Sequence, residues 1–409
     1  MLDGGDREAE SGSGVVGRFS KGGCAVKERT LARTLARYEQ APHLVFWETT
    51  KACSLACRHC RASAQKTALP GELSHDEGIA LLDEIATMPA PRPIVVFTGG
   101  DCFEREDLFE LVSHATQSGL RVGVAPSVTP RLTRDAMAGL YERGVRSVSI
   151  SLDGSNAQSH DSLRGIPGHF DDTLAALAML VEMGFRLQVN TTVMRRNARE
   201  LAEIARLLEN LGVAIWEVFF LVGVGRGSEI EEVSAEDAED ACHFLVDVAN
   251  RGMTVRTVEA PFFRRVQEER LALSTNDPAS AFSLGNLYRE LSAQLGARAA
   301  DARGHSATLA TGDGRGIVFV GFDGAVHASG FLPVTLGNVR DRSLGEIYTD
   351  SELLTSLRAG ELHGACGRCD YSRLCGGSRA RAYARTGDVL GDDPACVRTR
   401  ARRVQLAAR

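Results

Sequence analysis

A repeated strand–helix pattern restricts the fold of this chain more than any other feature. Six repeats of about 30 residues each carry an apolar strand followed by an amphipathic helical segment. The predicted strands are 44–49, 93–98, 120–125, 145–152, 185–193 and 213–221. The second strand is apolar throughout, which is typical of a strand that is buried on both faces of a parallel sheet.

Right-handed crossovers turn such repeats into one parallel sheet. The first helix is predicted to begin after Ser74, because Glu77 completes a capping box there. Six repeats are fewer than the eight of a complete barrel, although a short further strand is predicted at 253–258. We therefore predict an α/β fold with a partial (β/α)6 TIM-type barrel, whose chemistry lies at the C-terminal ends of the strands.

The cysteines indicate metal binding. Seven of the ten fall into two clusters, which favours metal in a reducing compartment over a disulfide framework. Cys53, Cys57 and Cys60 form a C-x3-C-x2-C loop directly after the first strand. Three thiolates at this spacing can bind three irons of a 4Fe–4S cube and leave the fourth iron open. A structural zinc loop with His59 as the fourth ligand is the alternative.

The second cluster lies in the C-terminal part of the chain, behind a β-hairpin that is predicted at 316–327. It consists of Cys366, Cys369, Cys375 and Cys396. Four thiolates make a closed site. Their spacing alone does not distinguish structural zinc from an iron–sulfur cluster.

With its C-x3-C-x2-C loop, the chain resembles the radical S-adenosylmethionine (SAM) enzymes over about 43–258 and about 316–398. The resemblance implies that SAM binds the open iron and is cleaved to a 5′-deoxyadenosyl radical. It also implies a flavodoxin- or ferredoxin-type reductant. The partial (β/α)6 core of that family agrees with the predicted barrel.

The end of the second strand matches the amino-group site of that family. There a Gly-Gly-Glu or Gly-Gly-Asp holds the methionine ammonium of SAM, and this chain has Gly99, Gly100 and Asp101. Glycines let the backbone approach a ligand closely, and a carboxylate can receive an ammonium group. The structural alternative is a plain turn at the end of a strand.

Four further residues are assigned by the resemblance. Ser151 and Arg164 match the pair that binds the SAM carboxylate, a task that suits a planar guanidinium. Asn190 and Leu221 match positions that contact ribose and adenine. A surface charge at Arg164 and a satisfied wall residue at Asn190 are the structural alternatives.

Residues 375–383 resemble a SPASM/twitch-type auxiliary domain, closest to the haem-pathway (iron-coproporphyrin decarboxylase-like) enzymes and near the peptide maturases. Complete SPASM domains bind two auxiliary clusters and need cysteines near 329 and at 379, where this chain has Ser329 and Arg379. We therefore expect one auxiliary 4Fe–4S cluster, held by Cys366, Cys369, Cys375 and Cys396. Complete ligation by the protein favours an electron relay.

Cys102 follows Asp101 at a position where the relatives usually have proline. A thiol beside the SAM pocket can donate a hydrogen atom to a substrate radical, as in radical epimerases. Packing as a small buried hydrophobe is the alternative.

We expect four segments: a flexible leader at 1–42, the barrel at 43–258, a bridging region at 259–315 and the auxiliary domain at 316–409. The net charge of −6 and the lack of a long basic stretch before the C-terminal tail argue against nucleic acid as a partner. The sequence has no signal-peptide pattern and no apolar run of about 20 residues, so we predict a cytoplasmic protein that does not enter membranes.

The predicted function is radical SAM chemistry of the oxidoreductase or lyase type. We expect net oxidation, by decarboxylation or bond formation, of a tetrapyrrole, a peptide or a small natural product. Two alternatives remain open at this point. They are a redox-neutral epimerase that uses Cys102, and a non-enzymatic two-cluster electron carrier or redox sensor.

Overall fold

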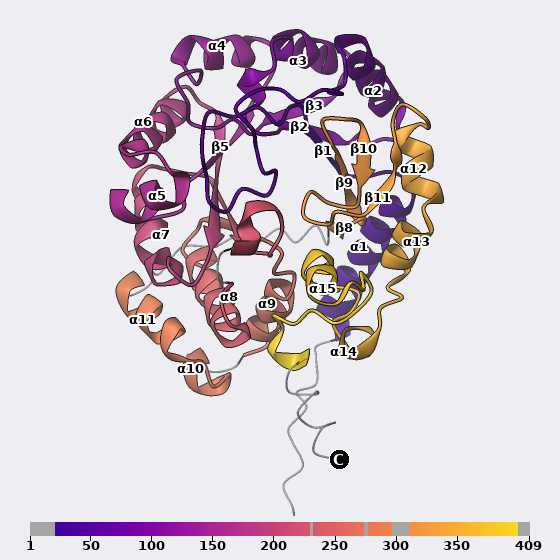
Figure 1. Ribbon diagram of the computed structural model, residues 1–409. Coiled ribbons are helices and arrows are strands. Elements are labelled where there is room, and N and C mark those ends of the chain that lie inside the picture. Colours follow the sequence, from indigo (N-terminus) through magenta and orange to yellow (C-terminus); the bar gives the residue numbers. More distant parts are fainter. Residues whose placement is uncertain (1–20, 230–231, 274–276, 297–310, 400–409) are drawn as a thin grey trace, which may run out of the picture.

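The computed structural model of the protein describes residues 21–229, 232–273, 277–296 and 311–399. Within these ranges the chain forms an 11-stranded sheet in the order β11-β10-β9-β1-β2-β3-β4-β5-β6-β7, with β8 paired to β9. Every neighbouring pair from β9 to β7 is parallel. The helices form a ring outside these strands (Figure 1).

The strand–helix repeats that the sequence predicts are present, and the α/β barrel class is confirmed. The barrel strands are β1 Leu44–Glu48, β2 Ile94–Thr98, β3 Arg121–Val124, β4 Ser147–Ser151, β5 Arg186–Val193, β6 Ile215–Phe220 and β7 Thr254–Val258. The helices that follow them in the repeats are α2 His75–Thr87, α3 Leu108–Gln117, α4 Arg134–Glu142, α6 His169–Glu182, α7 Leu201–Asn210 and α8 Ala235–Ala249. The predicted capping box at Ser74 and Glu77 is formed.

Large side chains fill the layer between the strands and the outer helices. Trp47 and Phe97 are register partners on β1 and β2, are both fully buried, and have ring centroids 5.5 Å apart. On α2, a Cβ at Gly78 would stand 2.8 Å from the Trp47 ring, so a residue without a side chain lets the helix approach. Burying one such aromatic side chain contributes about 2–3 kcal/mol.

The C-terminal hairpin extends the barrel sheet. The predicted hairpin is formed by β9 Gly316–Val320 and β10 Ala325–His327, and β8 Gly312–Asp313 and β11 Thr335–Asn338 flank it. We expected this hairpin to open a separate domain, but β9 pairs in parallel with β1. The reason is physical: an unpaired edge of β1 would leave its backbone groups without hydrogen-bond partners, and β9 supplies them.

The end of the leader also differs from the expectation of a flexible segment. Residues Lys21–Gln40 form helix α1, and residues 1–20 lie outside the described ranges. Tyr38 is 1% exposed, and the Tyr348 hydroxyl donates to its carbonyl at 2.6 Å. Tyr348 lies on α12 Leu344–Asp350, which precedes α13 Glu352–Ala359. Helix α1 is therefore anchored to the C-terminal part of the fold.

The remaining helices complete the ring and the C-terminal segment. They are α5 Ala157–Arg164, α9 Phe263–Leu271, α10 Pro278–Ala281, α11 Asn286–Leu295, α14 Gly364–Gly367 and α15 Arg379–Thr386. Short 3-10 helices occur at Cys102–Glu104, Ala198–Glu200 and Gly225–Glu229. None of the described helices combines the length and the apolar character that a membrane crossing requires.

One buried arginine joins α15 to the mouth of the barrel. The Arg381 guanidinium donates to the carbonyl of Glu259 at 2.7 Å and to those of Phe220 and Leu221 at 3.3 and 3.2 Å. Its charge is matched by Glu232 and Asp393, each at 3.5 Å. The end of β6, the residue after β7 and the cysteine-rich segment are thus held together by one side chain.

Replacing this side chain is expected to loosen the C-terminal segment. Arg381→Gln removes the charge and most donors, and it breaks the ion pair with the buried Asp393 carboxylate. Breaking a buried ion pair in this way costs about 3–5 kcal/mol. Thermal unfolding of the purified protein should therefore begin at a clearly lower temperature. As a control, Arg385→Gln on the same helix removes a side chain that is 57% exposed, and it should change stability by about 1 kcal/mol or less. Equal midpoints for the two variants would contradict this role of Arg381.

Candidate active site

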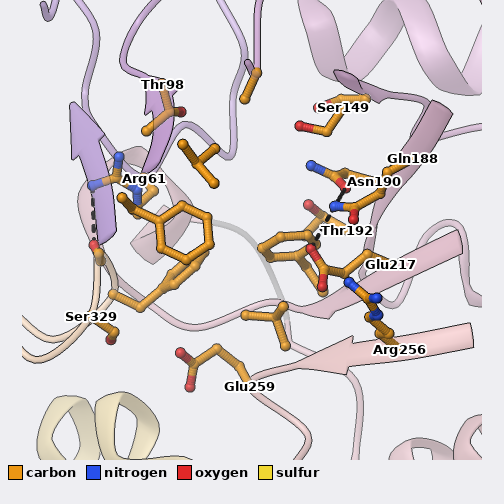
Figure 2. Close-up of a pocket in the computed structure, with 18 of the residues that line it drawn as sticks. Arg61, Thr98, Ser149, Gln188, Asn190, Thr192, Glu217, Arg256, Glu259 and Ser329 are labelled. Carbon is orange, nitrogen blue, oxygen red and sulfur yellow. Dashed lines mark hydrogen bonds between the residues drawn. The ribbon is translucent and has the colours of Figure 1, made fainter. Parts of the chain in front are cut away.

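The inside of the barrel holds a cavity of about 580 Å³. Its lining includes the thiols of Cys53, Cys57 and Cys60 and also that of Cys375, so both cysteine clusters reach the same space. Among the predicted site residues, Gly99, Gly100, Ser151, Arg164, Asn190 and Leu221 line it as well. Figure 2 shows side chains from several strands pointing into this cavity. The barrel therefore brings together residues that are far apart in the sequence.

The first cysteine loop is stabilised by hydrogen bonds to its sulfur atoms. The Cys53 sulfur accepts from the Leu55 backbone at 3.4 Å, and the Cys60 sulfur accepts from the Ala64 backbone at 3.4 Å. The Cys57 sulfur accepts from the Arg164 guanidinium at 3.6 Å. Hydrogen bonds of this kind favour thiolates and tune iron–sulfur clusters.

Glycines at the end of β2 hold this loop close to the sheet. A Cβ at Gly99 would lie 2.5 Å from the Thr50 carbonyl, and a Cβ at Gly100 would lie 2.3 Å from the Ala52 carbonyl. The backbone amides of Gly100 and Asp101 donate to these same carbonyls, at 2.8 and 2.7 Å. Any larger side chain would push the cysteine loop away from the strand.

Asp101 lies behind this contact and does not line the cavity. Its carboxylate is fully buried and accepts from the Thr129 hydroxyl at 2.8 Å and from the amides of Phe103 and Ser127 at 3.2 and 3.3 Å. Burial raises the pKa of Asp101. In this arrangement the carboxylate shapes the turn, and the glycine backbone faces the cavity.

A buried carboxylate connects the cysteine loop with Arg164. Asp153 forms ion pairs with Arg164 at 2.6 Å and with His59 at 3.0 Å. Although burial acts in the opposite direction, the charges of Arg164 and His59 hold the pKa of Asp153 below its ordinary value. The Nε of Arg164 and the Nδ1 of His59 are buried without a hydrogen-bond partner among the described residues. Both side chains therefore retain unused polar atoms next to the three thiols.

Two buried histidines position Asp153, and the sequence analysis did not identify this role. The Asp153 amide donates to the His160 Nδ1 at 3.1 Å, and the His160 and His169 rings are joined at 2.8 Å. The His169 Nε2 in turn lies 3.0 Å from the Val128 carbonyl. Burial, with the nearby charge of Arg164, lowers the pKa of both histidines. If both rings are neutral and carry their hydrogen on Nε2, each hydrogen bond from Asp153 through His160 and His169 to Val128 has one donor and one acceptor.

The cavity has one polar wall and one aromatic wall. Asn190 accepts from the Gln188 amide at 2.9 Å, and the same amide donates to Glu217 at 2.7 Å. Arg256 lies next to Glu217, across the cavity from Arg61 (Figure 2). The Arg256 Nε has no hydrogen-bond partner among the described residues. The other wall includes the rings of Phe46, Phe219, Phe319 and Phe331.

The four cysteines of the second cluster line one small cavity of about 30 Å³. The Cys366 sulfur accepts from the Asp393 amide and the Cys375 sulfur from the Gly377 amide, both at 3.4 Å. Burial raises the pKa of Cys366 and of Cys396, and a bound metal favours the thiolate form of such side chains. Within the described part of the chain, no three His, Cys, Asp or Glu side chains are grouped to hold a single ion. A cube requires no such group, because each thiolate binds a different iron. The donors fit an iron–sulfur cluster at both cysteine clusters.

Cys102 is fully buried and packs in the hydrophobic core rather than against the cavity. Burial raises the pKa of its thiol well above the ordinary value. The geometry thus favours packing, and nothing at Cys102 supports the epimerase alternative.

Glu259 is a cavity residue that the sequence analysis did not single out. It directly follows β7, is 6% exposed and has a φ of 59°, a left-handed conformation that is unusual for a residue with a side chain. The Ser378 hydroxyl donates to its carboxyl group, and Arg381 binds its carbonyl. Burial, together with the charge of Asp313, raises the pKa of Glu259. An unusual backbone held in place at a strand end is a common feature of functional sites, but the sequence carries no sign of it.

Comparisons with known proteins agree with this geometry. A family model described as the Radical SAM superfamily matches residues 47–208. The AdoMet-dependent heme synthase of Methanosarcina barkeri (strain Fusaro / DSM 804) is 36% identical over 359 residues, 87% of this chain and 97% of that protein. The mycofactocin maturase of Mycobacterium tuberculosis (strain CDC 1551 / Oshkosh) is 30% identical over 379 residues, 89% of this chain and 86% of that protein.

The fold is shared with a solved structure as well. SuiB of Streptococcus suis, bound to its precursor peptide SuiA, has a TM-score of 0.63 and 12% sequence identity to this chain. The match covers 95% of this chain and 84% of that one.

The raised pKa of Glu259 predicts a specific pH dependence of stability. The folded protein holds this proton at pH values where an unfolded glutamic acid, with a pKa of about 4.3, has lost it. Stability should therefore fall as the pH rises above that value, because ionisation costs more in the folded state. Glu259→Gln cannot ionise, so its thermal midpoint should exceed that of the wild type by a margin that grows with pH. The exposed control Glu182→Gln should follow the wild-type curve. Parallel curves for the wild type and Glu259→Gln would refute the assignment.

Proposed function

Because this chain belongs to the radical SAM superfamily, we propose that Cys53, Cys57 and Cys60 hold a 4Fe–4S cluster with one iron open to SAM. The observation that carries the proposal is the shared cavity, which joins these three thiols, the backbone at Gly99 and Gly100 and the thiol of Cys375. When bound, the cluster and SAM supply a 5′-deoxyadenosyl radical, with the electron coming from a flavodoxin- or ferredoxin-type reductant. The protein aims and shields this chemistry.

The chain's own residues bind and orient SAM. The carboxylate of Asp101 is occupied by three donors, so we assign the ammonium group of SAM to the backbone at Gly99 and Gly100. Arg164 keeps a free Nε donor, and we assign the SAM carboxylate to it together with Ser151. Asn190 and Leu221 are assigned to the ribose and the adenine.

A carboxylate-bearing tetrapyrrole is the substrate class that the cavity supports best. About 580 Å³ lies within the usual range of ligand pockets. The aromatic wall suits the flat face of a macrocycle, and the Arg256 guanidinium on the polar wall suits a side-chain carboxylate. The heme synthase relative, at 36% identity, supports this choice.

A peptide substrate is the second candidate, because the mycofactocin maturase is 30% identical over most of this chain. In either case the expected outcome is a net oxidation, by decarboxylation or bond formation. We propose that an auxiliary 4Fe–4S cluster on Cys366, Cys369, Cys375 and Cys396 takes up the electron that the substrate loses. The position of Cys375 at the cavity wall supports a short path to it.

The cleavage of SAM can be tested directly. Anaerobically reconstituted protein with dithionite and SAM should release 5′-deoxyadenosine, and Cys53→Ala should abolish this release because the cube loses one of its three ligands. Cys242→Ala serves as the matched control, since Cys242 is a buried cysteine on α8 outside both clusters. Its release of 5′-deoxyadenosine should stay close to that of the wild type. Wild-type protein that contains a cube but releases no 5′-deoxyadenosine would overturn the proposal.

The substrate class is tested with iron coproporphyrin and a variant of the polar wall. The wild-type enzyme should release CO2 from a propionate side chain in a reaction that requires SAM. Arg256→Gln removes a charge-assisted hydrogen bond of about 1.5–3 kcal/mol, so KM should rise about 10- to 100-fold while SAM cleavage without substrate is retained. Arg206→Gln, on the exposed face of α7 and outside the cavity lining, should change KM little. Turnover of a peptide but not of the tetrapyrrole would favour the second candidate.

A further inference from the structure

Arg379 is a buried arginine at the second cysteine cluster. It is the first residue of α15 and is 4% exposed. Three backbone carbonyls hold its guanidinium: Gly377 at 3.2 Å, Val389 at 2.9 Å and Gly391 at 2.6 Å. The remaining nitrogen, Nη2, donates to the sulfur of Cys366 at 3.9 Å. This clamp of three carbonyls thus fixes a positive charge beside the Cys366 thiol.

This charge is not cancelled by an ion pair. Within the described ranges, no carboxylate forms an ion pair with Arg379, and its hydrogen-bond acceptors are the three carbonyls and the Cys366 sulfur. Arg381 on the same helix differs, because Glu232 and Asp393 match its charge. Since the surroundings of Arg379 are buried, its field at Cys366 is weakly screened. The carboxylates of Asp392 and Asp393 also lie near Cys366 and act in the opposite direction, so the Arg379 charge offsets theirs.

Gly377 makes this approach possible. Its φ is +67°, and a Cβ there would stand 2.5 Å from the Nη2 of Arg379 and 3.3 Å from the Cys366 sulfur. A side chain at 377 would therefore displace the guanidinium from the thiol. The turn at Gly377, the clamp of carbonyls and the arginine form one arrangement around Cys366.

We infer that Arg379 raises the reduction potential of the auxiliary cluster and thereby makes it an electron acceptor for the substrate. The inference rests on the proposed function, since it needs an iron–sulfur cluster on Cys366. Hydrogen bonds to the sulfurs and the local net charge both set the potential of such clusters. A fixed positive charge stabilises the reduced state, which carries one more negative charge.

The electron balance shows why an acceptor is needed. Abstraction of a hydrogen atom leaves a carbon radical next to the carbon that bears the carboxylate. The bond to the carboxylate then breaks, CO2 leaves, a C=C bond forms and one electron remains. Arg379 favours the uptake of this electron by the auxiliary cluster. Ser329 and Arg379 occupy the positions of two cysteines in the two-cluster SPASM pattern. At position 379, this chain therefore has a fixed positive charge in place of a thiol.

The test is an EPR-monitored redox titration of the reconstituted full-length enzyme. In Arg379→Gln the midpoint potential of the auxiliary cluster should fall enough to weaken electron uptake about tenfold, which corresponds to about 59 mV for a one-electron couple. Arg385→Gln is the matched control, because it removes the same charge from the exposed face of α15. Its midpoint should equal that of the wild type. An unchanged midpoint in Arg379→Gln, with the iron content retained, would overturn the inference.

A second pair of variants decides the case in which Arg379→Gln does not assemble the cluster. Arg379→Lys keeps the charge but cannot reach three carbonyls and a sulfur at once, so its midpoint should lie below that of Arg385→Lys. Equal midpoints for the two lysine variants, or failure of Arg379→Lys to bind iron, would reduce Arg379 to a structural residue. A wild-type protein without a second cluster would instead refute that part of the proposed function, and iron quantification of the wild type distinguishes the two results.

Discussion

The site depends on one buried carboxylate. Asp153 binds His59 within the first cysteine loop and Arg164 at the end of α5, and it is itself held through its backbone by His160. Arg164 and His59 around one carboxylate leave this part of the cavity with a surplus of donors rather than acceptors. A ligand that has a carboxylate group and that also coordinates an iron atom can use these donors and the neighbouring cysteine loop at the same time. Arg164 also donates to the Cys57 sulfur, so the same guanidinium joins Asp153 to the first cysteine loop.

The barrel places this local arrangement at the wall of a cavity that other strand ends also line. Its strands end at the same mouth, so the cysteine loop after β1, the glycines after β2 and Glu259 after β7 surround one space. Cys375, Gly377 and Ser378 of the C-terminal segment line the same space, and Arg381 fixes this segment to the backbone at the ends of β6 and β7. A substrate in the cavity therefore lies between two thiol clusters. Radical chemistry requires this kind of enclosure, because water and stray hydrogen donors compete with the intended reaction.

The sequence predicts the parts of the structure that depend on local pattern. Strand–helix alternation gives the parallel barrel, and cysteine spacing gives both thiol clusters. The features that it misses depend on contacts between distant segments. The pairing of β9 with β1 follows from an open sheet edge, which no window of sequence shows. The Asp101 carboxylate is occupied by Thr129 and Ser127, which come from a different loop. Likewise, the left-handed backbone of Glu259 is maintained by Ser378 and Arg381, more than a hundred residues away.

The two buried arginines of α15 show that the partners of a side chain decide what its charge does. The charge of Arg381 is matched by carboxylates, so its contribution is mechanical: it docks the helix against the barrel. The hydrogen bonds of Arg379 end on carbonyls and on one sulfur, so its charge acts on that sulfur. Both residues lie within one turn of the same helix. The docking that Arg381 provides therefore also fixes how far the Arg379 charge lies from the cavity, and the same contacts that hold the fold together set the conditions for electron transfer.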